Sequence, residues 1–341
     1  MSWIEEYQKR ISIDKSSSFI SKLAQAECFI ITDNNLEKLY HDEILQKHKY
    51  YSIEPGEASK TLSQANKILE RMLKLNLTRN VIVVGFGGGV VCDLTGFVSA
   101  IYKRGCPLFL MPTSLLAMVD AAIGGKNGVN SKNYKNQFGT IRHPNWINID
   151  QELLESLPAP EYLNGAAEMI KHGLIYSLEY HAKVKAPYTY VLDHQSREMQ
   201  ELIKESIAIK LHFVSDDEGD RGKRRYLNFG HTLGHVIEKQ LNIPHGVAVI
   251  WGMIQAIRLS YHSELISSET FTRLRDELRL AIFLKQFEIE WKDIAKALLN
   301  DKKREGEGIT FILLTKVGSP VVKELSLEFI KNAIMGEDGV I

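Results

Sequence analysis

An apolar run that leads straight into a cluster of glycines limits the possible folds of this chain more than any other feature. Residues 81–84 read Val-Ile-Val-Val and continue into Gly85-Phe-Gly-Gly-Gly89. A buried strand followed by glycines and a helical stretch is the βα unit of an α/β nucleotide-binding domain. Apolar runs at 27–32 and 108–111 predict further strands, and the apolar spacing in 61–76 predicts a helix. We therefore expect a Rossmann-like α/β domain at the N-terminus.

The character of the sequence changes after about residue 150. A chain of 341 residues is long enough for two domains. Beyond this point only residues 309–314 resemble a strand, and amphipathic helical stretches are expected at 151–156, 161–177, 197–213, 230–240, 247–265, 268–279 and 291–299. We predict an α/β domain over 1–150 and a mostly α-helical domain over 151–341. Residues 124–140, rich in Gly, Asn and Lys, are expected to form a functional loop.

Composition argues against several classes of partner. The formal net charge is +0 at pH 7, so no overall field favours nucleic acid or an anionic membrane. The three cysteines include no CxxC pair, which argues against a disulfide framework or a cysteine-based zinc site. No apolar run is long enough to span a bilayer, and the first residues lack the layout of a signal peptide. We expect a cytoplasmic protein that binds neither nucleic acid nor membrane.

The glycines that follow the strand at 81–84 have two interpretations. Gly87, Gly88 and Gly89 would let the backbone approach a pyrophosphate, whose charge a helix N-terminus favours. The segment lacks the third glycine of a GxGxxG fingerprint, so tight packing within the turn explains it equally well. Asp93, four residues further on, would either bind a ribose hydroxyl or cap the helix.

A second segment, residues 118–136, has the composition of an anion site. Lys126 and Lys135 lie among small residues, and a phosphate or carboxylate needs both positive charge and close backbone access. The alternative is a solvated basic loop. Val119 and Ile123 flank Asp120 and indicate a partly buried segment, which favours a site.

A third segment places a carboxylate and an amine on one helix face. Glu168 and Lys171 are three residues apart, so they would share a face. Their simplest interpretation is a surface ion pair of little energetic value. The small residues at 165–167 would let a bulky group approach Glu168, which slightly favours a site. The neighbouring His172 is expected to be structural.

Three of the eleven histidines fall within residues 231–245. His231 and His235 are four residues apart and would share a helix face, and His245 follows an expected turn at 242–244. The metalloprotease motif is excluded because Thr232 stands where it requires glutamate. One histidine of the pair, His245 and an oxygen of Glu168 would instead give three ligands and the open position that a catalytic zinc needs. The remaining histidine would bind an anion or transfer a proton.

Taken in order, four segments resemble those of the 3-dehydroquinate synthase family, within the sugar phosphate cyclase superfamily. The segments are 87–97 (GGGVVCDLTGF), 112–126 (PTSLLAMVDAAIGGK), 165–171 (GAAEMIK) and 227–235 (LNFGHTLGH). The resemblance implies a carbon–oxygen lyase of the shikimate pathway of aromatic amino acid biosynthesis. Its substrate would be 3-deoxy-D-arabino-heptulosonate 7-phosphate, and its cofactors NAD and a divalent metal, zinc or cobalt. It also implies a homodimer.

The resemblance also implies roles for individual residues. The metal ligands would be Glu168, His231 and His245. The catalytic residues would be Asp120, Lys126, Lys171, Lys210, Arg224, Asn228 and His235. Further substrate contacts would come from Arg104, donated across a dimer interface, Asn136 and Lys303. NAD would be bound by Asp33, Asn35, Glu57, Lys60, Gly88, Gly89, Asp93, Thr113, Ser114, Lys126 and Lys135. The sequence departs from the usual pattern at Cys92, Thr95 and Asn127.

The reaction implied by the resemblance is an oxidation, a phosphate elimination, a reduction and an aldol ring closure, with NAD regenerated within one turnover. The substrate's own phosphate is expected to act as the base. Three alternatives remain open from the sequence. They are another cyclase that forms an inosose or a valiolone, a metal-dependent alcohol or glycerol dehydrogenase, and a catalytically inactive binding protein on the same scaffold.

Overall fold

The computed structural model divides into two compact units, Met1–Leu157 and Pro158–Ile341. It describes residues 3–23, 26–131, 134–185, 196–215, 217, 222–281, 289–299 and 308–335. The 3-10 helix Gln151–Ser156 lies in the first unit. In the described residues, no helix combines the length and the apolarity needed to cross a membrane.

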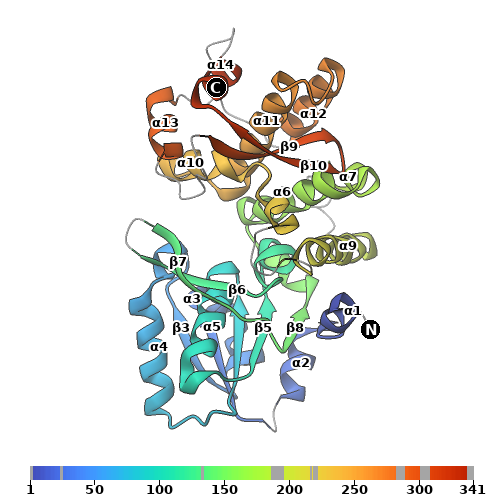
Figure 1. Ribbon diagram of the computed structural model, residues 1–341. Helices are drawn as coiled ribbons and strands as arrows, with labels where there is room; N and C mark the ends of the chain where they lie inside the picture. Colours follow the sequence, from blue (N-terminus) through green and yellow to red (C-terminus); the bar gives the residue numbers. More distant parts are fainter. Residues whose placement is uncertain are drawn as a thin grey trace. The chain divides into compact units, whose positions relative to one another are not determined.

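A six-stranded parallel sheet forms the centre of the N-terminal unit (Figure 1). Its strand order is β1-β8-β5-β4-β2-β3. The strands are β1 Ile11–Ile13, β2 Cys28–Asp33, β3 Lys49–Ile53, β4 Ile82–Gly87, β5 Leu108–Pro112 and β8 Trp146–Ile149. The strands predicted at 27–32, 81–84 and 108–111 are confirmed as β2, β4 and β5. The chain runs outward from β2 to β3 and then returns to β4, so the carboxyl ends of β2 and β4 flank the point where the strand order reverses.

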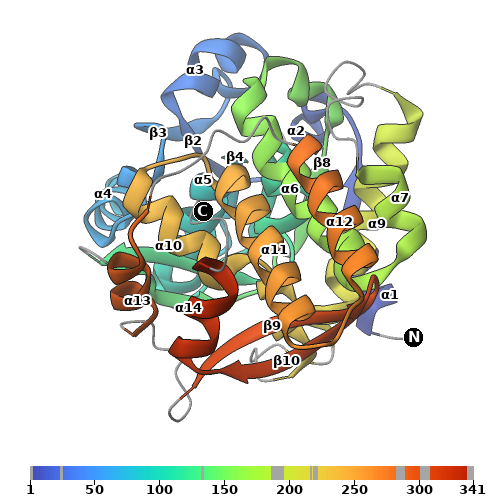
Figure 2. The ribbon, with the colours of Figure 1, turned by 90° about the horizontal axis from the view of Figure 1, so that it is seen from above.

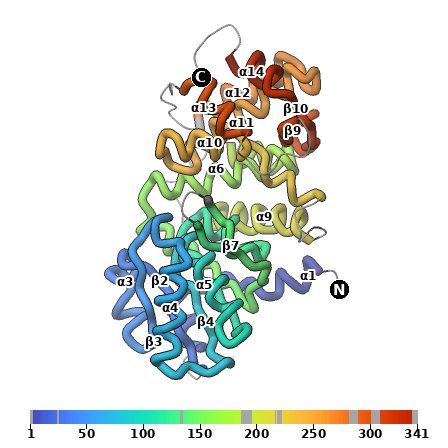
Figure 3. Tube along the Cα trace, turned by 60° about the vertical axis from the view of Figure 1, so that its left-hand side comes forward, coloured from blue at the N-terminus to red at the C-terminus, as the bar shows by residue number. Residues whose placement is uncertain are grey.

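Helices pack on both faces of this sheet. They are α2 Ser16–Lys22, α3 Asn34–Tyr40, α4 Leu62–Lys74 and α5 Gly89–Ile101, whereas α1 Trp3–Gln8 contacts His143 through Trp3 and Tyr7. Ile68 of α4 and Leu94 of α5 share a core with Val83 of β4, and Figure 3 shows both helices beside the strands. Phe19 of α2 contacts Phe109 of β5, with ring centroids 6.2 Å apart. Phe109 follows the residue paired with Val83, so α2 lies on the opposite face.

The segment expected as a loop at 124–140 contains an antiparallel hairpin, so that expectation is wrong. Its strands are β6 Lys126–Ser131 and β7 Tyr134–Ile141. Gly128 pairs with Gly139 across the hairpin. A Cβ atom on Gly139 would lie 2.6 Å from the carbonyl oxygen of Asn127. The glycines that suggested a loop are therefore sites where two paired backbones approach closely.

The C-terminal unit is mostly helical, as predicted. Its helices are α6 Ala159–Tyr176, α7 Leu178–Val184, α9 Arg197–Val214, α10 His231–Leu241, α11 His245–His262, α12 Ser268–Ala281, α13 Trp291–Leu299 and α14 Leu327–Met335. The predicted strand at 309–314 is confirmed as β9 Ile309–Lys316, which pairs antiparallel with β10 Ser319–Leu325. Strand β10 was not predicted from the sequence because it is only partly buried and begins at an irregular Ser319–Pro320 step.

Helix α11 lies at the centre of the C-terminal unit, where it packs against α6, α10, α12, α14 and β9 (Figure 2). Glycines bring α10 and α11 together. A Cβ atom on Gly252 would lie 1.9 Å from the carbonyl oxygen of Gly230, and one on Gly234 would lie 2.9 Å from that of Ala248. The two helices therefore meet backbone to backbone, and each of them begins with a histidine, His231 or His245.

Candidate functional site

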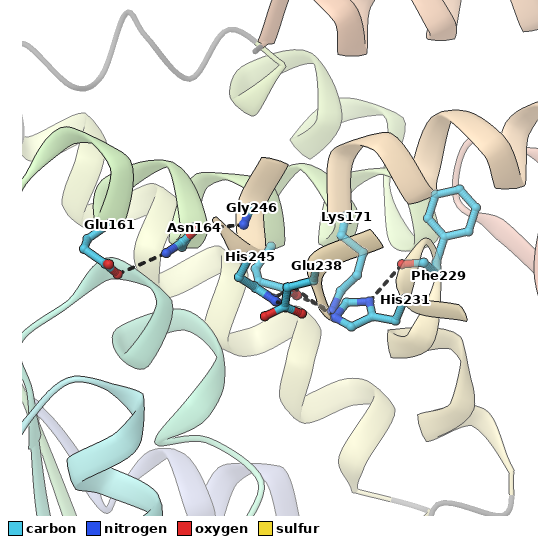
Figure 4. Close-up of polar contacts among 9 residues, drawn as sticks. Glu161, Asn164, Lys171, Phe229, His231, Glu238, His245 and Gly246 are labelled. Carbon is cyan, nitrogen blue, oxygen red and sulfur yellow. Dashed lines mark hydrogen bonds and ion pairs between the residues drawn. The ribbon is translucent and has the colours of Figure 1, made fainter. Parts of the chain in front are cut away.

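Glu168, His231 and His245 meet inside the C-terminal unit, each from a different helix. Figure 4 shows the two histidines beside Lys171 and Glu238. The Nε2 atoms of both histidines lie 3.3 Å from the same carboxylate oxygen, Oε1 of Glu168. One ligand-type atom from each of the three residues lies within 4.8 Å of the others. Glu168 is fully buried. One carboxylate and two imidazoles are a typical ligand set of a catalytic zinc site.

The local sequence explains how these side chains come together. Gly230 has a φ of +79°, and this left-handed residue precedes His231 at the start of α10. Asn242, with a φ of +50°, ends α10, and Pro244 precedes His245, so the turn expected at 242–244 is confirmed. The first turn of α11 lies directly against α6, since a Cβ atom on Gly246 would lie 2.6 Å from the carbonyl oxygen of Leu163.

The Nδ1 atoms of both ligand-type histidines face hydrogen-bond acceptors. That of His231 lies 3.1 Å from the carbonyl oxygen of Phe229, and that of His245 lies 3.4 Å from a carboxylate oxygen of Glu238. A carbonyl oxygen only accepts, so Nδ1 of His231 donates and its Nε2 is left without a proton in the neutral ring. Burial lowers the pKa of His231 and favours that neutral ring. Two acceptors, Nε2 of His231 and Oε1 of Glu168, then face each other, and a cation between them satisfies both.

Lys171 forms a buried ion pair with Oε2 of Glu168. The surface interpretation of this pair is therefore wrong. The reason is that α6 is buried on every side from Asn164 to Ile175, so it has no surface face there for the pair to occupy. Burial acts to raise the pKa of Glu168, but Lys171 and the two histidines hold it well below its usual range. Burial likewise acts to lower the pKa of His245, but hydrogen bonds with Glu168 and Glu238 raise it to about 9.

His235 and Glu238 lie beside this group on α10. The ring centroid of His235 is 5.0 Å from that of His231 and 6.2 Å from that of His245. His235, Glu238 and His245 also offer ligand-type atoms within 4.8 Å of one another. Glu238 was not predicted from the sequence, although its position seven residues after His231 places both on one helix face. His172, expected to be structural, is buried with Nδ1 2.8 Å from the Ser206 hydroxyl.

Three further predicted residues lie on elements that pack against α6. These elements are α9, which carries Lys210, and the 3-10 helix Lys223–Asn228, which carries Arg224 and Asn228. Lys210 and Arg224 are buried. The backbone N–H of Arg224 donates to a carboxylate oxygen of Asp217. Lys303, the remaining predicted phosphate ligand, lies outside the described residues.

In the N-terminal unit, predicted NAD-binding residues gather at the carboxyl ends of three neighbouring strands. Asp33 ends β2, Gly88 follows β4, and Thr113 and Ser114 follow β5. Asp33 accepts hydrogen bonds from the backbone N–H groups of Asn35 and Leu36 and so caps α3. Ligands of open α/β sheets bind at this edge, beside the point where the strand order reverses.

The three glycines that follow the β4 strand differ in the space around them: a Cβ atom would clash at Gly87 but would fit at Gly88 and Gly89. A Cβ atom on Gly87 would lie 2.5 Å from Val91, so packing explains this glycine. One on Gly88 would meet only Ser114, at 3.5 Å, and one on Gly89 only Ala121, at 3.4 Å. Packing therefore does not require glycine at 88 or 89, which favours the nucleotide interpretation there.

A hydrogen-bonded chain joins four of the predicted residues of this unit. The buried Lys60 ammonium pairs with Asp93 and donates to Oδ1 of Asn136 at 2.6 Å. The Asn136 backbone N–H donates to Oδ1 of Asn130, whose amide donates to Glu57 at 2.7 Å. Asp93 does not cap α5, because the N-cap is Gly88. Asn130, which connects the hairpin to Glu57, was missed by the sequence analysis.

The remaining predicted residues of the N-terminal unit are more exposed. Lys126 and Lys135 are exposed residues of the hairpin, and Asp120 is half-buried in a π-helical turn, Ala117–Ala121. Arg104 is exposed within Lys103–Gly105, where φ is +45°, +68° and +112° in succession. Cys92 is buried in α5, and its thiol points to the carbonyl oxygen of Gly87.

Comparison with known proteins identifies the family. Residues 50–164 match the family model described as 3-dehydroquinate synthase N-terminal, and residues 165–304 match the C-terminal one. A 3-dehydroquinate synthase of Thermoanaerobacter pseudethanolicus is 36% identical over 335 residues, which cover 95% of this chain and 94% of that protein. The chain belongs to the 3-dehydroquinate synthase family.

Solved structures share the fold of this 3-dehydroquinate synthase family member. A 2-deoxy-scyllo-inosose synthase complexed with carbaglucose-6-phosphate, NAD+ and Co2+ superimposes with a TM-score of 0.84 at 24% identity. A 2-epi-5-epi-valiolone synthase from Streptomyces hygroscopicus with NAD+ and Zn2+ bound gives 0.86 at 22% identity. Each match covers 95% of both chains. The predicted fold class, an α/β domain followed by a helical domain, is confirmed.

Proposed function

We propose that this protein converts 3-deoxy-D-arabino-heptulosonate 7-phosphate to 3-dehydroquinate and phosphate, as a lyase that depends on NAD and a divalent metal. The observation that carries the proposal is the convergence of two imidazole Nε2 atoms on one buried carboxylate oxygen in a chain of this family. The facing acceptors of His231 and Glu168 fit a cation rather than a plain hydrogen bond.

Glu168, His231 and His245 would hold the metal. A bound ion would polarise substrate hydroxyl and carbonyl oxygens and lower the pKa of the hydroxyl. Nitrogen and oxygen ligands suit zinc and also cobalt. Co2+ and Zn2+ are the ions of the two solved cyclases. Lys171 would keep the carboxylate of Glu168 ionised and oriented before the ion arrives.

The N-terminal unit would bind NAD at the carboxyl edge of its sheet. The open turn at Gly88–Gly89 would admit the pyrophosphate, and Lys60 would hold Asp93 in a fixed position. The other contacts would come from Asp33, Asn35, Glu57, Thr113, Ser114, Lys126 and Lys135. NAD would supply a hydride acceptor, which side chains do not provide.

The substrate would be bound by polar side chains. Lys171, Lys210, Asn228 and Asp120 would contact its hydroxyls and carboxylate. Its phosphate would be bound by Arg224, His235, Lys126, Asn136 and Lys303. Buried cations such as Arg224 stabilise the charge that grows on phosphate as it leaves, because little water screens them. The phosphate itself would act as the base, since the buried carboxylate of Glu168 is committed to the metal and Lys171.

We also propose a homodimer in which Arg104 contacts the substrate of the partner subunit. Lys103 and Arg104 are two successive non-glycine residues at positive φ, which is energetically costly, and such strain persists where surrounding structure imposes it. Here it presents Arg104 on the surface. Sedimentation of the purified protein tests the dimer.

The decisive experiment supplies the metal-loaded protein with NAD and the heptulosonate phosphate, and measures phosphate release and product identity. Phosphate release with 3-dehydroquinate formation and no net NADH supports the proposal. Turnover only of the sugar phosphates used by inosose or valiolone synthases would make it another cyclase. Net NADH formation from glycerol or a simple alcohol would make it a dehydrogenase.

A further inference from the structure

We propose that Asn164 and Glu238 are positioning residues for His245, and that they set the affinity of the C-terminal unit for its metal. The inference rests on the proposed function only in taking His245 as a metal ligand. Neither residue was selected from the sequence. Both are linked to His245 or to the residue beside it by hydrogen bonds that Figure 4 shows.

Asn164 fixes the main chain at His245. Its Oδ1 atom accepts a hydrogen bond from the backbone N–H of Gly246 at 2.7 Å, in a buried position. This N–H lies in the first turn of α11, where no intrahelical partner exists. The amide of Asn164 donates in turn to Glu161 at 3.0 Å, which fixes its orientation.

Asn164 lies on α6 close to Glu168, so the residue that caps the start of α11 and one of the proposed ligands belong to the same helix. Asn164 precedes Glu168 by four residues, so both lie on one face of α6, one turn apart. Gly246 is held against the α6 backbone, because any Cβ atom there would lie 2.8 Å from the Cα atom of Asn164. One turn of α6 therefore holds the start of α11, and the next presents Glu168 to His245.

Glu238 fixes the imidazole ring of His245. Its Oε2 atom lies 3.4 Å from Nδ1, on the opposite side of the ring from Glu168. A carboxylate at this position favours the N–H at Nδ1 and leaves Nε2 for the metal, as carboxylates that accept from the other ring nitrogen do for zinc-binding histidines in general. Glu238 lies two turns after His231 on α10.

The two positioning residues follow one pattern. Helix α6 contributes the ligand Glu168 and the cap Asn164, and helix α10 contributes the ligand His231 and the ring partner Glu238. Each helix that supplies a ligand thus also restrains His245, the ligand from α11. Loss of either restraint lets His245 move relative to ligands that remain in place, so the first effect is on metal affinity.

The test measures metal affinity in the full-length protein without substrate. The metal is removed with a chelator, and Zn2+ affinity is then measured by competition with a chromophoric chelator, with stoichiometry by elemental analysis. We expect Glu238→Ala to weaken Zn2+ binding by about 10- to 100-fold, as loss of the hydrogen-bond partner of a metal-binding histidine typically does. Glu238→Gln should weaken it less, because the amide oxygen still accepts from Nδ1. Both variants should change the visible spectrum of bound Co2+.

For Asn164 the variants are Asn164→Ala and Asn164→Ser, the second of which keeps an acceptor for the helix start. We expect Asn164→Ala to weaken Zn2+ binding and Asn164→Ser to recover part of the loss. The matched control is Ser326→Ala, which removes another N-cap of this unit, the one that accepts from the backbone N–H of Phe329. It should lower the melting temperature and leave Zn2+ affinity unchanged.

Unchanged Zn2+ affinity in Glu238→Ala and Asn164→Ala would overturn the proposal. So would a second ion per chain that disappears in Glu238→Ala, because Glu238 would then be a ligand of the His235, Glu238 and His245 group. An equal loss of Zn2+ affinity in Ser326→Ala would also overturn the proposal, because the loss would then follow from lower protein stability in general. Weakened Zn2+ binding in a protein that does not turn over the heptulosonate phosphate would leave this inference standing and refute the proposed function alone.

Discussion

The ammonium of Lys171 pairs with Oε2 of Glu168 across one turn of α6, and both side chains are almost completely removed from water. Oε1 of the same carboxylate faces His231 and His245. Glu168 is therefore shared between a permanent cation and the proposed metal. The energetic consequence of removing Lys171 should depend on whether the metal is bound.

Replacement of Lys171 by methionine should destabilise the metal-free protein by about 1.5–3 kcal/mol, since the buried carboxylate loses a charged hydrogen bond and keeps only its contacts with the two histidines. Saturating Zn2+ should restore part of this loss, because the ion then compensates Glu168. Urea unfolding with and without Zn2+ measures both values. Lys183→Met, which breaks the exposed pair with Glu205, is the control and should cost about 0–1 kcal/mol. Equal destabilisation by Lys171→Met in both metal states would contradict the shared carboxylate.

Replacement of His231 by alanine should abolish metal retention and turnover together, because two ligands do not hold the ion. Elemental analysis after gel filtration and a phosphate-release assay measure the two effects. His262→Ala, at the far end of α11, should retain both. Full activity of His231→Ala in metal-stripped buffer would refute the ligand assignment.

Replacement of the buried Arg224 by methionine should lower kcat/KM for the phosphate-bearing substrate. Loss of a charged hydrogen bond costs about 1.5–3 kcal/mol, so kcat/KM should fall on the order of 10- to 100-fold. Steady-state kinetics measure this ratio. The neighbouring, less buried Arg225 is the matched control, and Arg225→Met should change kcat/KM little. Unchanged KM and kcat in Arg224→Met would argue against a phosphate contact.

Alanine substitutions in the glycine turn should separate packing from nucleotide binding. Gly88→Ala should leave the free energy of unfolding nearly unchanged, since its Cβ atom has room, but should lower NAD affinity by obstructing the pyrophosphate. Gly87→Ala should destabilise the unit by about 1–3 kcal/mol, because its Cβ atom would overlap Val91. Thermal unfolding measures the change in stability, and calorimetric titration with NAD measures the change in affinity. Undiminished NAD affinity in Gly88→Ala would place the nucleotide elsewhere.

Metal uptake should depend on pH because Glu168 and Glu238 raise the pKa of His245 to about 9 in the metal-free protein. A raised histidine pKa stabilises the metal-free fold fully below the unfolded value near 6.5, and this contribution is lost as pH rises through 9. Zn2+ must displace the proton, so its apparent affinity should increase with pH up to about 9. Calorimetry in two buffers of different ionisation enthalpy should report release of about one proton per ion at neutral pH. A pH-independent affinity between 6.5 and 9 would contradict this coupling.

The sequence predicted those features of the fold that depend on local pattern. Residues 81–89 show an apolar strand that breaks into glycines, and this is β4 followed by α5. Strand β10 was missed because its partial burial depends on pairing with β9, which is a tertiary relationship. The hairpin of β6 and β7 was missed for the same reason, since Gly128 and Gly139 have a clear role only when the two strands face each other.

The same distinction applies to the candidate site. Glu168, His231 and His245 were selected because their residue types and motifs indicate metal ligation. Asn164 and Glu238 carry no such motif. Their roles appear only when the start of α11 is seen to lie on α6 and the Nδ1 atom of His245 is seen to face α10. Asn130 likewise gains its role from the hairpin that the sequence did not predict.

The meeting of α10 and α11 at Gly230, Gly234 and Gly252 has a consequence for how this protein tolerates mutation. The separation of His231 and His245 is set by main chains in direct contact, not by the sizes of intervening side chains. Large apolar residues around the crossing are therefore expected to exchange with one another at little cost to the ligand geometry. The residues whose substitution most disturbs the proposed metal site should therefore be these three glycines, where any added side chain would push the two helices apart.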